Sequence, residues 1–93
     1  MRESALERML VREVEKRGGL APKWTSPGNA GVPDRIVILP NGQTIYVEMK
    51  APGKPLRPLQ ERWGRLLTQR KHKWYVLDSK QGIIDFIAKE FPA

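Results

Sequence analysis

Two acidic residues and a lysine mark the ends of the two most apolar segments of this sequence. Asp34 precedes the run "RIVIL", and Glu48 and Lys50 end the run "TIYVEMK". If the fold brings these three side chains together, the two carboxylates can hold a hard divalent cation and the amine can position a water molecule for hydrolysis. If the fold keeps them apart, they are ordinary surface charges. The pairing of the two segments decides between these interpretations.

The two segments are predicted to be adjacent strands of a β-hairpin, because both are rich in β-branched and aromatic residues and they flank the turn sequence "PNG". A two-residue Asn-Gly turn would pair Asp34 with Met49, and the two carboxylates would point to opposite faces. A three-residue turn that includes Pro40 would pair Asp34 with Glu48. We favour the three-residue turn, since Pro prefers the first corner of a type I turn and Gly accepts the left-handed position that follows.

In the favoured register the Cβ atoms of Asp34 and Glu48 would lie about 5 Å apart. Carboxylates at this separation repel one another unless a cation lies between them, and oxygen ligands of this kind suit Mg²⁺ or Mn²⁺. Lys50 follows Glu48 by two residues and shares its face of the strand. The hairpin therefore predicts a divalent metal site, although a Glu-x-Lys sequence at a strand end is common and is weak evidence alone.

The rest of the chain supplies the elements that position this hairpin. Hydrophobic periodicity and turn residues predict a helix at 3–17, strands at 20–24, 34–39 and 43–49, a helix at 59–70, a strand at 73–78 and a helix at 81–91. The apolar stripe of the second helix comprises Leu59, Trp63, Leu66 and Leu67. Strand, helix and strand in succession usually form a right-handed parallel crossover, so the last strand should lie parallel to the second hairpin strand. The fold class is therefore α/β, with a mixed sheet flanked by helices in one domain spanning residues 1–93.

Composition favours an anionic partner. The 93 residues include 17 Lys and Arg against 10 Asp and Glu, which gives a formal charge of +7. Nucleic acid is the partner that such a charge suggests, although on charge alone a basic protein without this partner is about equally consistent. The chain has no cysteine, and its only histidine, His72, lies in the basic sequence "RKHK". Thiolate metal sites and disulfides are thereby excluded, and no export signal or membrane segment is expected.

Four short motifs occur in order along the chain: "ALERML" on the first helix, "GVPD" before the first long strand, "VEMK" at the end of the second, and "LQ" at the start of the next helix. In this order they resemble the VRR-NUC domain, the virus-type replication-repair nuclease branch of the PD-(D/E)xK superfamily. They span nearly the whole chain without an insertion, as in the compact stand-alone form of phages and prophages. The resemblance implies a restriction-endonuclease-like αβββαβ core and a location in the cytoplasm of a bacterial host.

The resemblance also implies a set of site residues. Asp34 and Glu48 would be the metal carboxylates, the Met49 main-chain carbonyl a further ligand, Lys50 the catalytic lysine and Gln60 a glutamine beside the site. A glutamate of the first helix completes the family pattern, and we choose Glu7 for its distance from the Gly18 turn, whereas Glu3 lies one helical turn earlier on a similar face. Basic residues on the loop and helix that follow are expected to contact phosphate, namely Lys54, Arg57, Arg62 and Arg65.

The expected activity is hydrolysis of DNA phosphodiester bonds with Mg²⁺ or Mn²⁺. Because basic side chains contact the DNA backbone, we expect selection by DNA structure and not by base order. We expect one site per chain, whereas resolution of a four-way junction requires two symmetric cuts. A homodimer would supply both cuts, so we expect a homodimer. The alternatives are a nuclease for flaps or other branched DNA, a non-catalytic DNA-binding module, and a restriction-like enzyme, for which no major-groove readers are identified.

Overall fold

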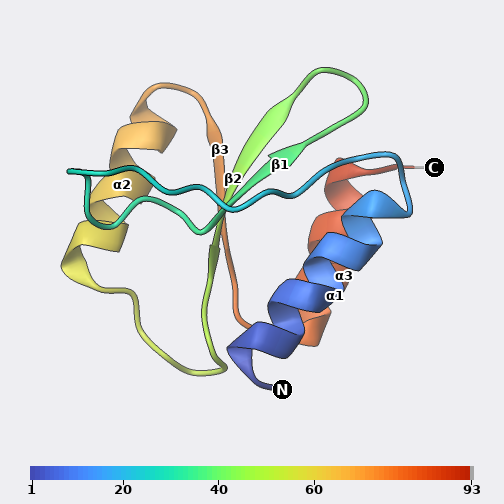
Figure 1. The fold of residues 1–93 in the computed structure, drawn as a ribbon, viewed down its shortest axis with the longest axis horizontal. Helices are drawn as coiled ribbons and strands as arrows, with labels where there is room; N and C mark the ends of the chain where they lie inside the picture. Colours follow the sequence, from blue (N-terminus) through green and yellow to red (C-terminus); the bar gives the residue numbers. More distant parts are fainter. Residues whose placement is uncertain (93) are drawn as a thin grey trace.

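A mixed β-sheet lies between two helices on one face and a third helix on the other (Figure 1). The computed structural model describes residues 1–92, and its elements are α1 (Glu3–Glu15), β1 (Arg35–Ile38), β2 (Thr44–Met49), α2 (Pro58–Gln69), β3 (Lys73–Leu77) and α3 (Lys80–Glu90). The strand order is β1-β2-β3, with β1 antiparallel and β3 parallel to β2. The predicted α/β class and parallel crossover are confirmed. No helix within the described chain is long and apolar enough to cross a membrane.

The hairpin between β1 and β2 has the three-residue turn. The Gly42 N–H donates to the Leu39 carbonyl at 3.1 Å, and Gly42 has a φ of 91°, in the left-handed region. The strands pair Ile36 with Tyr46. The same register, continued by two residues, places Asp34, which precedes β1, opposite Glu48 of β2. The predicted register is therefore confirmed, and both carboxylates belong to one face of the sheet.

The segment predicted as a strand at 20–24 lies beside β1 but forms only isolated bridges to it. Pro22 within the segment has no N–H group to donate to a ladder. At the end of the segment, the Trp24 N–H donates to the main-chain carbonyl of Asp34 at 2.9 Å. This short edge segment therefore holds the backbone of one of the two carboxylate residues.

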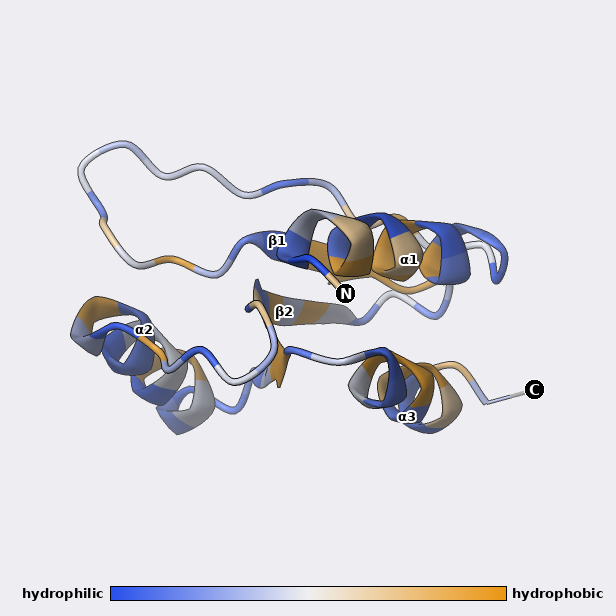
Figure 2. Cartoon of the chain, turned by 90° about the horizontal axis from the view of Figure 1, so that it is seen from below, coloured by the Kyte–Doolittle hydropathy of each residue, from blue (hydrophilic) through white to orange (hydrophobic). Residues whose placement is uncertain are grey.

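The main core lies between the sheet and the helices α1 and α3, which turn their apolar sides inward (Figure 2). Its fully buried side chains include Leu6, Leu10, Val14, Val37, Ile45, Val47, Ile83 and Phe86. Side chains along a strand alternate between the two faces of a sheet. Glu48, which lies between the core residues Val47 and Met49, therefore points to the opposite face, toward α2.

Helix α2 packs on that opposite face through aromatic side chains. Trp63 of α2 lies edge-on to Trp24 with ring centroids 6.0 Å apart, and Trp24 lies 5.4 Å from Tyr46 of β2. The Trp63 indole N–H also donates to the Ala30 carbonyl at 3.1 Å, which ties the loop before β1 to the helix. Leu59, the first member of the predicted stripe, does not join this packing and is 49% exposed.

Gly64 allows α2 to approach the sheet closely. A Cβ atom at this position would lie 2.4 Å from carbons of the rigid Trp74 indole ring. We therefore expect Gly64→Ala to lower the free energy of unfolding by about 1–3 kcal/mol, even though alanine favours a helix more than glycine does. Urea denaturation followed by circular dichroism measures the change, with Arg62→Ala at an exposed position of α2 away from Trp74 as the control. Equal stability of the two variants would show that the helix moves aside without cost.

Candidate active site

Two carboxylates meet at the end of the hairpin that lies away from its turn. Glu48 is only 2% exposed, and the carboxylate of Asp34 lies within hydrogen-bonding reach of it. One oxygen of Asp34 also accepts a 2.8 Å hydrogen bond from the Met49 N–H. The structure thus brings together the two acidic side chains that the sequence predicted to be neighbours, and it fixes Asp34 through the main chain of β2.

The electrostatic environment of this pair is unfavourable for two negative charges. Burial is the main cause that raises the pKa of Glu48, and the hydrogen bond and charge of Asp34 add to it, so that the pKa reaches about 9. The charge of Lys50, whose side chain is largely buried, lowers the Glu48 pKa but does not offset the other effects. A cation between the carboxylates would remove the repulsion.

Glu90 shows how this protein stabilises a buried carboxylate by other means. Lys73 donates to Glu90 at 2.7 Å, and the Tyr75 hydroxyl donates to its second oxygen. Burial raises the pKa of Glu90, but the hydrogen bonds from Lys73 and Tyr75 outweigh burial and hold the pKa below its ordinary value. Glu48 has no ion pair with a basic side chain within the described residues. The raised pKa of Glu48 therefore reflects its burial first and the neighbouring Asp34 second, with no basic side chain in direct contact to offset them.

Gln60 connects α2 to the carboxylate pair. Its Oε1 atom accepts a 2.9 Å hydrogen bond from the Arg57 N–H, so its amide N–H group faces Glu48, at 3.4 Å. Pro58 occupies the first turn of the helix, where its fixed φ is favourable. A contact of 3.4 Å is long for a hydrogen bond. Gln60 therefore helps to orient the Glu48 side chain, but its neutral amide does not balance a negative charge on Glu48.

The two candidate glutamates of α1 have different surroundings. Glu7 forms an ion pair with Arg35, at 2.8 Å and 3.3 Å from two guanidinium nitrogens, and Arg35 also donates to the Ala21 carbonyl. Glu3 is exposed in the first turn of α1, the end of the helix that lies near the chain leaving β2 (Figure 1), and its charge contributes to the raised pKa of Glu48. Glu7 therefore belongs to an ion pair that fixes α1 to β1, and Glu3 is left as the α1 glutamate whose charge acts on Glu48.

The basic residues assigned to DNA contact are exposed on the loop after β2 and on α2. They are Lys54, Arg57, Arg62 and Arg65. Within residues 1–92, none of these side chains forms an ion pair with an acidic group. Glu61 is the only acidic residue of α2. This side of the molecule therefore offers cationic groups that are free to bind phosphate.

The donor set of the site fits a hard divalent cation. Asp34, Glu48 and the Met49 carbonyl would hold the ion through oxygen atoms. Mg²⁺ is typically bound in proteins through one or two carboxylates while it keeps several waters. No group of three or more acidic or histidine side chains gathers at one point in the described part of the chain. A site with few protein ligands leaves coordination positions for waters and for a phosphate oxygen.

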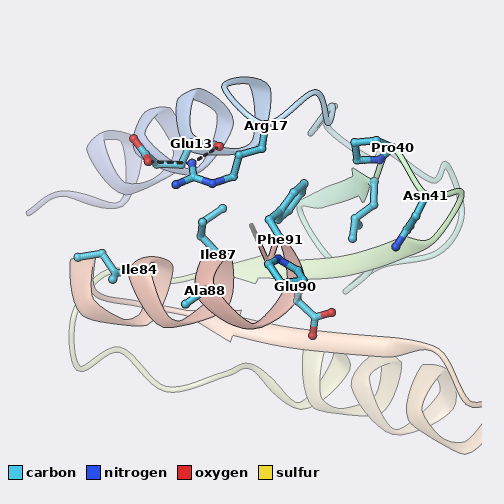
Figure 3. A pocket seen from close by; sticks show the side chains of 11 residues that line it. Glu13, Arg17, Pro40, Asn41, Ile84, Ile87, Ala88, Glu90 and Phe91 are labelled. Atoms are coloured by element: carbon cyan, nitrogen blue, oxygen red, sulfur yellow. Dashed lines mark hydrogen bonds and ion pairs between the residues drawn. The ribbon is translucent and has the colours of Figure 1, made fainter.

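A cavity of about 780 Å³ lies elsewhere, between α1, α3 and the hairpin turn (Figure 3). Its walls are mainly apolar and include Ile87 and Phe91 of the C-terminal region. Its Glu13 and Arg17 side chains pair with each other at 3.2 Å. The cavity lies at the turn end of the hairpin, away from the carboxylate pair, so it takes no part in the chemistry of that pair.

Comparison with known proteins supports the family resemblance. Residues 2–81 match the family model described as "VRR-NUC domain". The chain belongs to the VRR-NUC family. It is 51% identical over 80 residues to "Putative nuclease p44" of Acyrthosiphon pisum secondary endosymbiont phage 1, with 86% of each chain covered. A solved structure described as "VRR_NUC domain" is 28% identical, with a TM-score of 0.86 and 96% of each chain covered.

The VRR-NUC assignment agrees with the position of the motifs in space. The "GVPD" and "VEMK" motifs supply the two carboxylates that meet at the end of the hairpin, and "LQ" supplies the glutamine that contacts Glu48. The restriction-endonuclease-like fold predicted from the sequence is confirmed by the solved VRR-NUC structure. Membership of this family supports a nuclease as the general function.

Proposed function

We propose that this VRR-NUC protein is a metal-dependent, structure-selective DNA endonuclease that acts on four-way junctions as a homodimer. The observation that carries the proposal is the pair of carboxylates, Asp34 and buried Glu48, which lack a cationic partner in direct contact within the described chain. The phage origin of the similar nuclease p44 supports a site of action in the cytoplasm of a bacterial host.

In the proposed reaction, a water oxygen attacks the phosphorus atom while the bond to the leaving oxygen breaks. Asp34, Glu48 and the Met49 carbonyl would hold Mg²⁺ or Mn²⁺, which would stabilise the negative charge that builds on the phosphate. Lys50 orients the attacking water or helps to deprotonate it. Gln60 keeps Glu48 in place through the contact at 3.4 Å.

Substrate binding in this proposal depends on the exposed cations of the loop and α2. They contact the phosphate backbone, so affinity should fall steeply as salt concentration rises. Each chain carries one carboxylate pair, whereas resolution of a four-way junction needs two symmetric cuts. A two-fold dimer supplies both cuts.

A cleavage panel tests the proposal. Four-way, flap and linear DNA are incubated with the protein and Mg²⁺ or Mn²⁺, and the oligomeric state is measured in parallel by light scattering. We expect the junction to be cut fastest and the protein to be a dimer. Preferential cutting of flaps would support the alternative substrate. A folded protein that binds DNA but cuts none of the substrates would be a non-catalytic DNA-binding module.

The two glutamates of α1 can be separated by matched substitutions. Because Glu7 pairs with Arg35 and both side chains are mostly buried, Glu7→Gln should lower the free energy of unfolding by about 1–3 kcal/mol. Glu3→Gln removes the acidic group of the first turn of α1, so it should lower stability by no more than about 1 kcal/mol, and it should reduce metal-dependent cleavage by about tenfold or more. Thermal denaturation and cleavage rates measure the two effects, with exposed Glu15→Gln as the control. Loss of cleavage at normal stability in Glu7→Gln would instead assign Glu7 to the site.

A further inference from the structure

Leu59 is an exposed apolar residue at the rim of the proposed active site. It is 49% exposed, although it begins the apolar stripe of α2 whose later members pack on the sheet. The next residue, Gln60, contacts Glu48. Leu59 therefore projects into solvent from the same helical turn that reaches the carboxylate pair.

The backbone under Leu59 is held firmly. Gly31, with a φ of 90°, lies so close that a Cβ atom there would be 2.6 Å from the carbonyl carbon and oxygen of Leu59. The Ala30 carbonyl next to it accepts the hydrogen bond from Trp63, one turn further along α2. Pro58 restricts the backbone on the other side. These contacts fix the first turn of α2 against the loop before β1, so Leu59 is presented from a rigid support.

Exposed cationic side chains precede and follow Leu59 along the chain. Arg62 follows it by three residues and is its neighbour on the helix surface. Arg57 and Lys54 precede it on the loop, and all three basic side chains are exposed. Glu61 is the only acidic residue of α2, so the exposed charges near Leu59 in the chain, three basic and one acidic, remain net positive. An apolar side chain flanked by cations is complementary to a nucleotide, whose base face is apolar and whose neighbouring phosphates are anionic.

We propose that Leu59 packs against a base that is unstacked at a DNA branch point, while the surrounding cations bind the adjacent phosphates. In a continuous duplex the base faces are covered by stacking, and a protein meets only base edges and backbone. At a branch the stack is interrupted, and an apolar side chain can insert at the exposed base face, as side chains that kink DNA do. Leu59 thereby favours branched over continuous DNA. This inference rests on the proposed function. Leu59 is the residue that makes the proposed endonuclease selective for branched DNA.

The experiment compares affinities for a four-way junction and a linear duplex of the same sequence. Every protein carries Asp34→Asn, so that binding is measured without cutting. The duplex-to-junction ratio of Kd values reports selectivity. Leu59→Ala should lower this ratio about fivefold, because about half of the leucine side chain is exposed and available for apolar contact with a base, and alanine loses most of that contact. Leu59→Met keeps an apolar side chain and should retain the ratio. Ile84→Ala, which alters a similarly exposed residue on α3, is the control.

A second measurement uses 2-aminopurine at the branch, whose fluorescence rises when the base leaves the stack. The parent protein should raise this fluorescence, and Leu59→Ala should raise it less. The inference would be overturned by an unchanged Kd ratio, or by an equal loss of affinity for both DNAs. If the wild-type protein cuts no DNA, the proposed function fails, yet the binding ratio still tests Leu59. If it cuts junctions and the ratio is unchanged, the inference about Leu59 alone fails.

Discussion

Glu48→Gln should make the metal-free protein more stable at pH 8 and abolish its stabilisation by Mg²⁺ or Mn²⁺. The substitution keeps the shape of a side chain that is 2% exposed, and glutamine, unlike Glu48, needs no proton to be neutral in the folded protein. The expected gain in unfolding free energy is on the order of 3 kcal/mol. Thermal denaturation in a chelator, repeated with added metal, measures both effects, and Asp85→Asn on the surface of α3 is the control.

The sign of this effect depends on pH. The pKa of Glu48 is about 9 in the folded protein, against an ordinary value of 4.5. Because the folded pKa is raised, the neutral carboxyl group contributes its full stabilisation below pH 4.5, and this stabilisation is lost as pH rises toward 9. The metal-free wild type should therefore lose stability relative to Glu48→Gln across this window. The same stability difference at about pH 5 and pH 8 would contradict the assignment of a raised pKa to Glu48.

Lys50→Met should reduce DNA cleavage by about a thousandfold or more while DNA affinity changes little. Lys50 is buried beside the carboxylates, and methionine keeps most of its volume while removing the amine. Lys54→Ala is the matched comparison, since Lys54 is exposed on the adjoining loop. It should weaken DNA binding and reduce the salt dependence of binding, with a smaller effect on the cleavage rate of bound DNA.

These two lysine variants are measured by single-turnover cleavage and by fluorescence anisotropy. The first assay reports the rate for bound DNA, and the second reports affinity. A Lys50→Met protein that cuts at the wild-type rate would remove Lys50 from the chemistry. A large loss of affinity in Lys50→Met, with an unchanged rate for bound DNA, would make Lys50 a DNA-binding residue instead.

Local sequence was sufficient to predict the carboxylate pair. Pro40 and Gly42 specify the three-residue turn, and a turn of known length determines which residues of a hairpin face each other. The turn alone therefore predicts that Asp34 and Glu48 lie on one face, independently of the remaining fold. The raised pKa of Glu48 could not be predicted in this way, because it depends on burial that arises only in the folded protein.

The local sequence pattern does not show which of the two glutamates of α1 pairs with a residue of another element. Periodicity places Glu3 and Glu7 on a similar side of the helix, so it does not distinguish them. The distinguishing contact is the ion pair of Glu7 with Arg35, a residue of another element. Leu59 has a similar explanation. Leu59 has the spacing of the apolar stripe of α2. However, it lies one turn before Trp63, the residue of that stripe that contacts Trp24, and it remains exposed.

The most direct test of the metal-dependent site is cleavage of a four-way junction as a function of Mn²⁺ concentration, with wild type and Asp34→Asn compared side by side. Asparagine keeps an oxygen that can accept the Met49 N–H hydrogen bond, so the fold around the site should be retained. We predict cleavage by the wild type that rises with metal and stops in chelator, and no cleavage by the variant. Equal cleavage by the two proteins, or wild-type cleavage that persists at the same rate in chelator, would contradict the proposed role of the carboxylate pair.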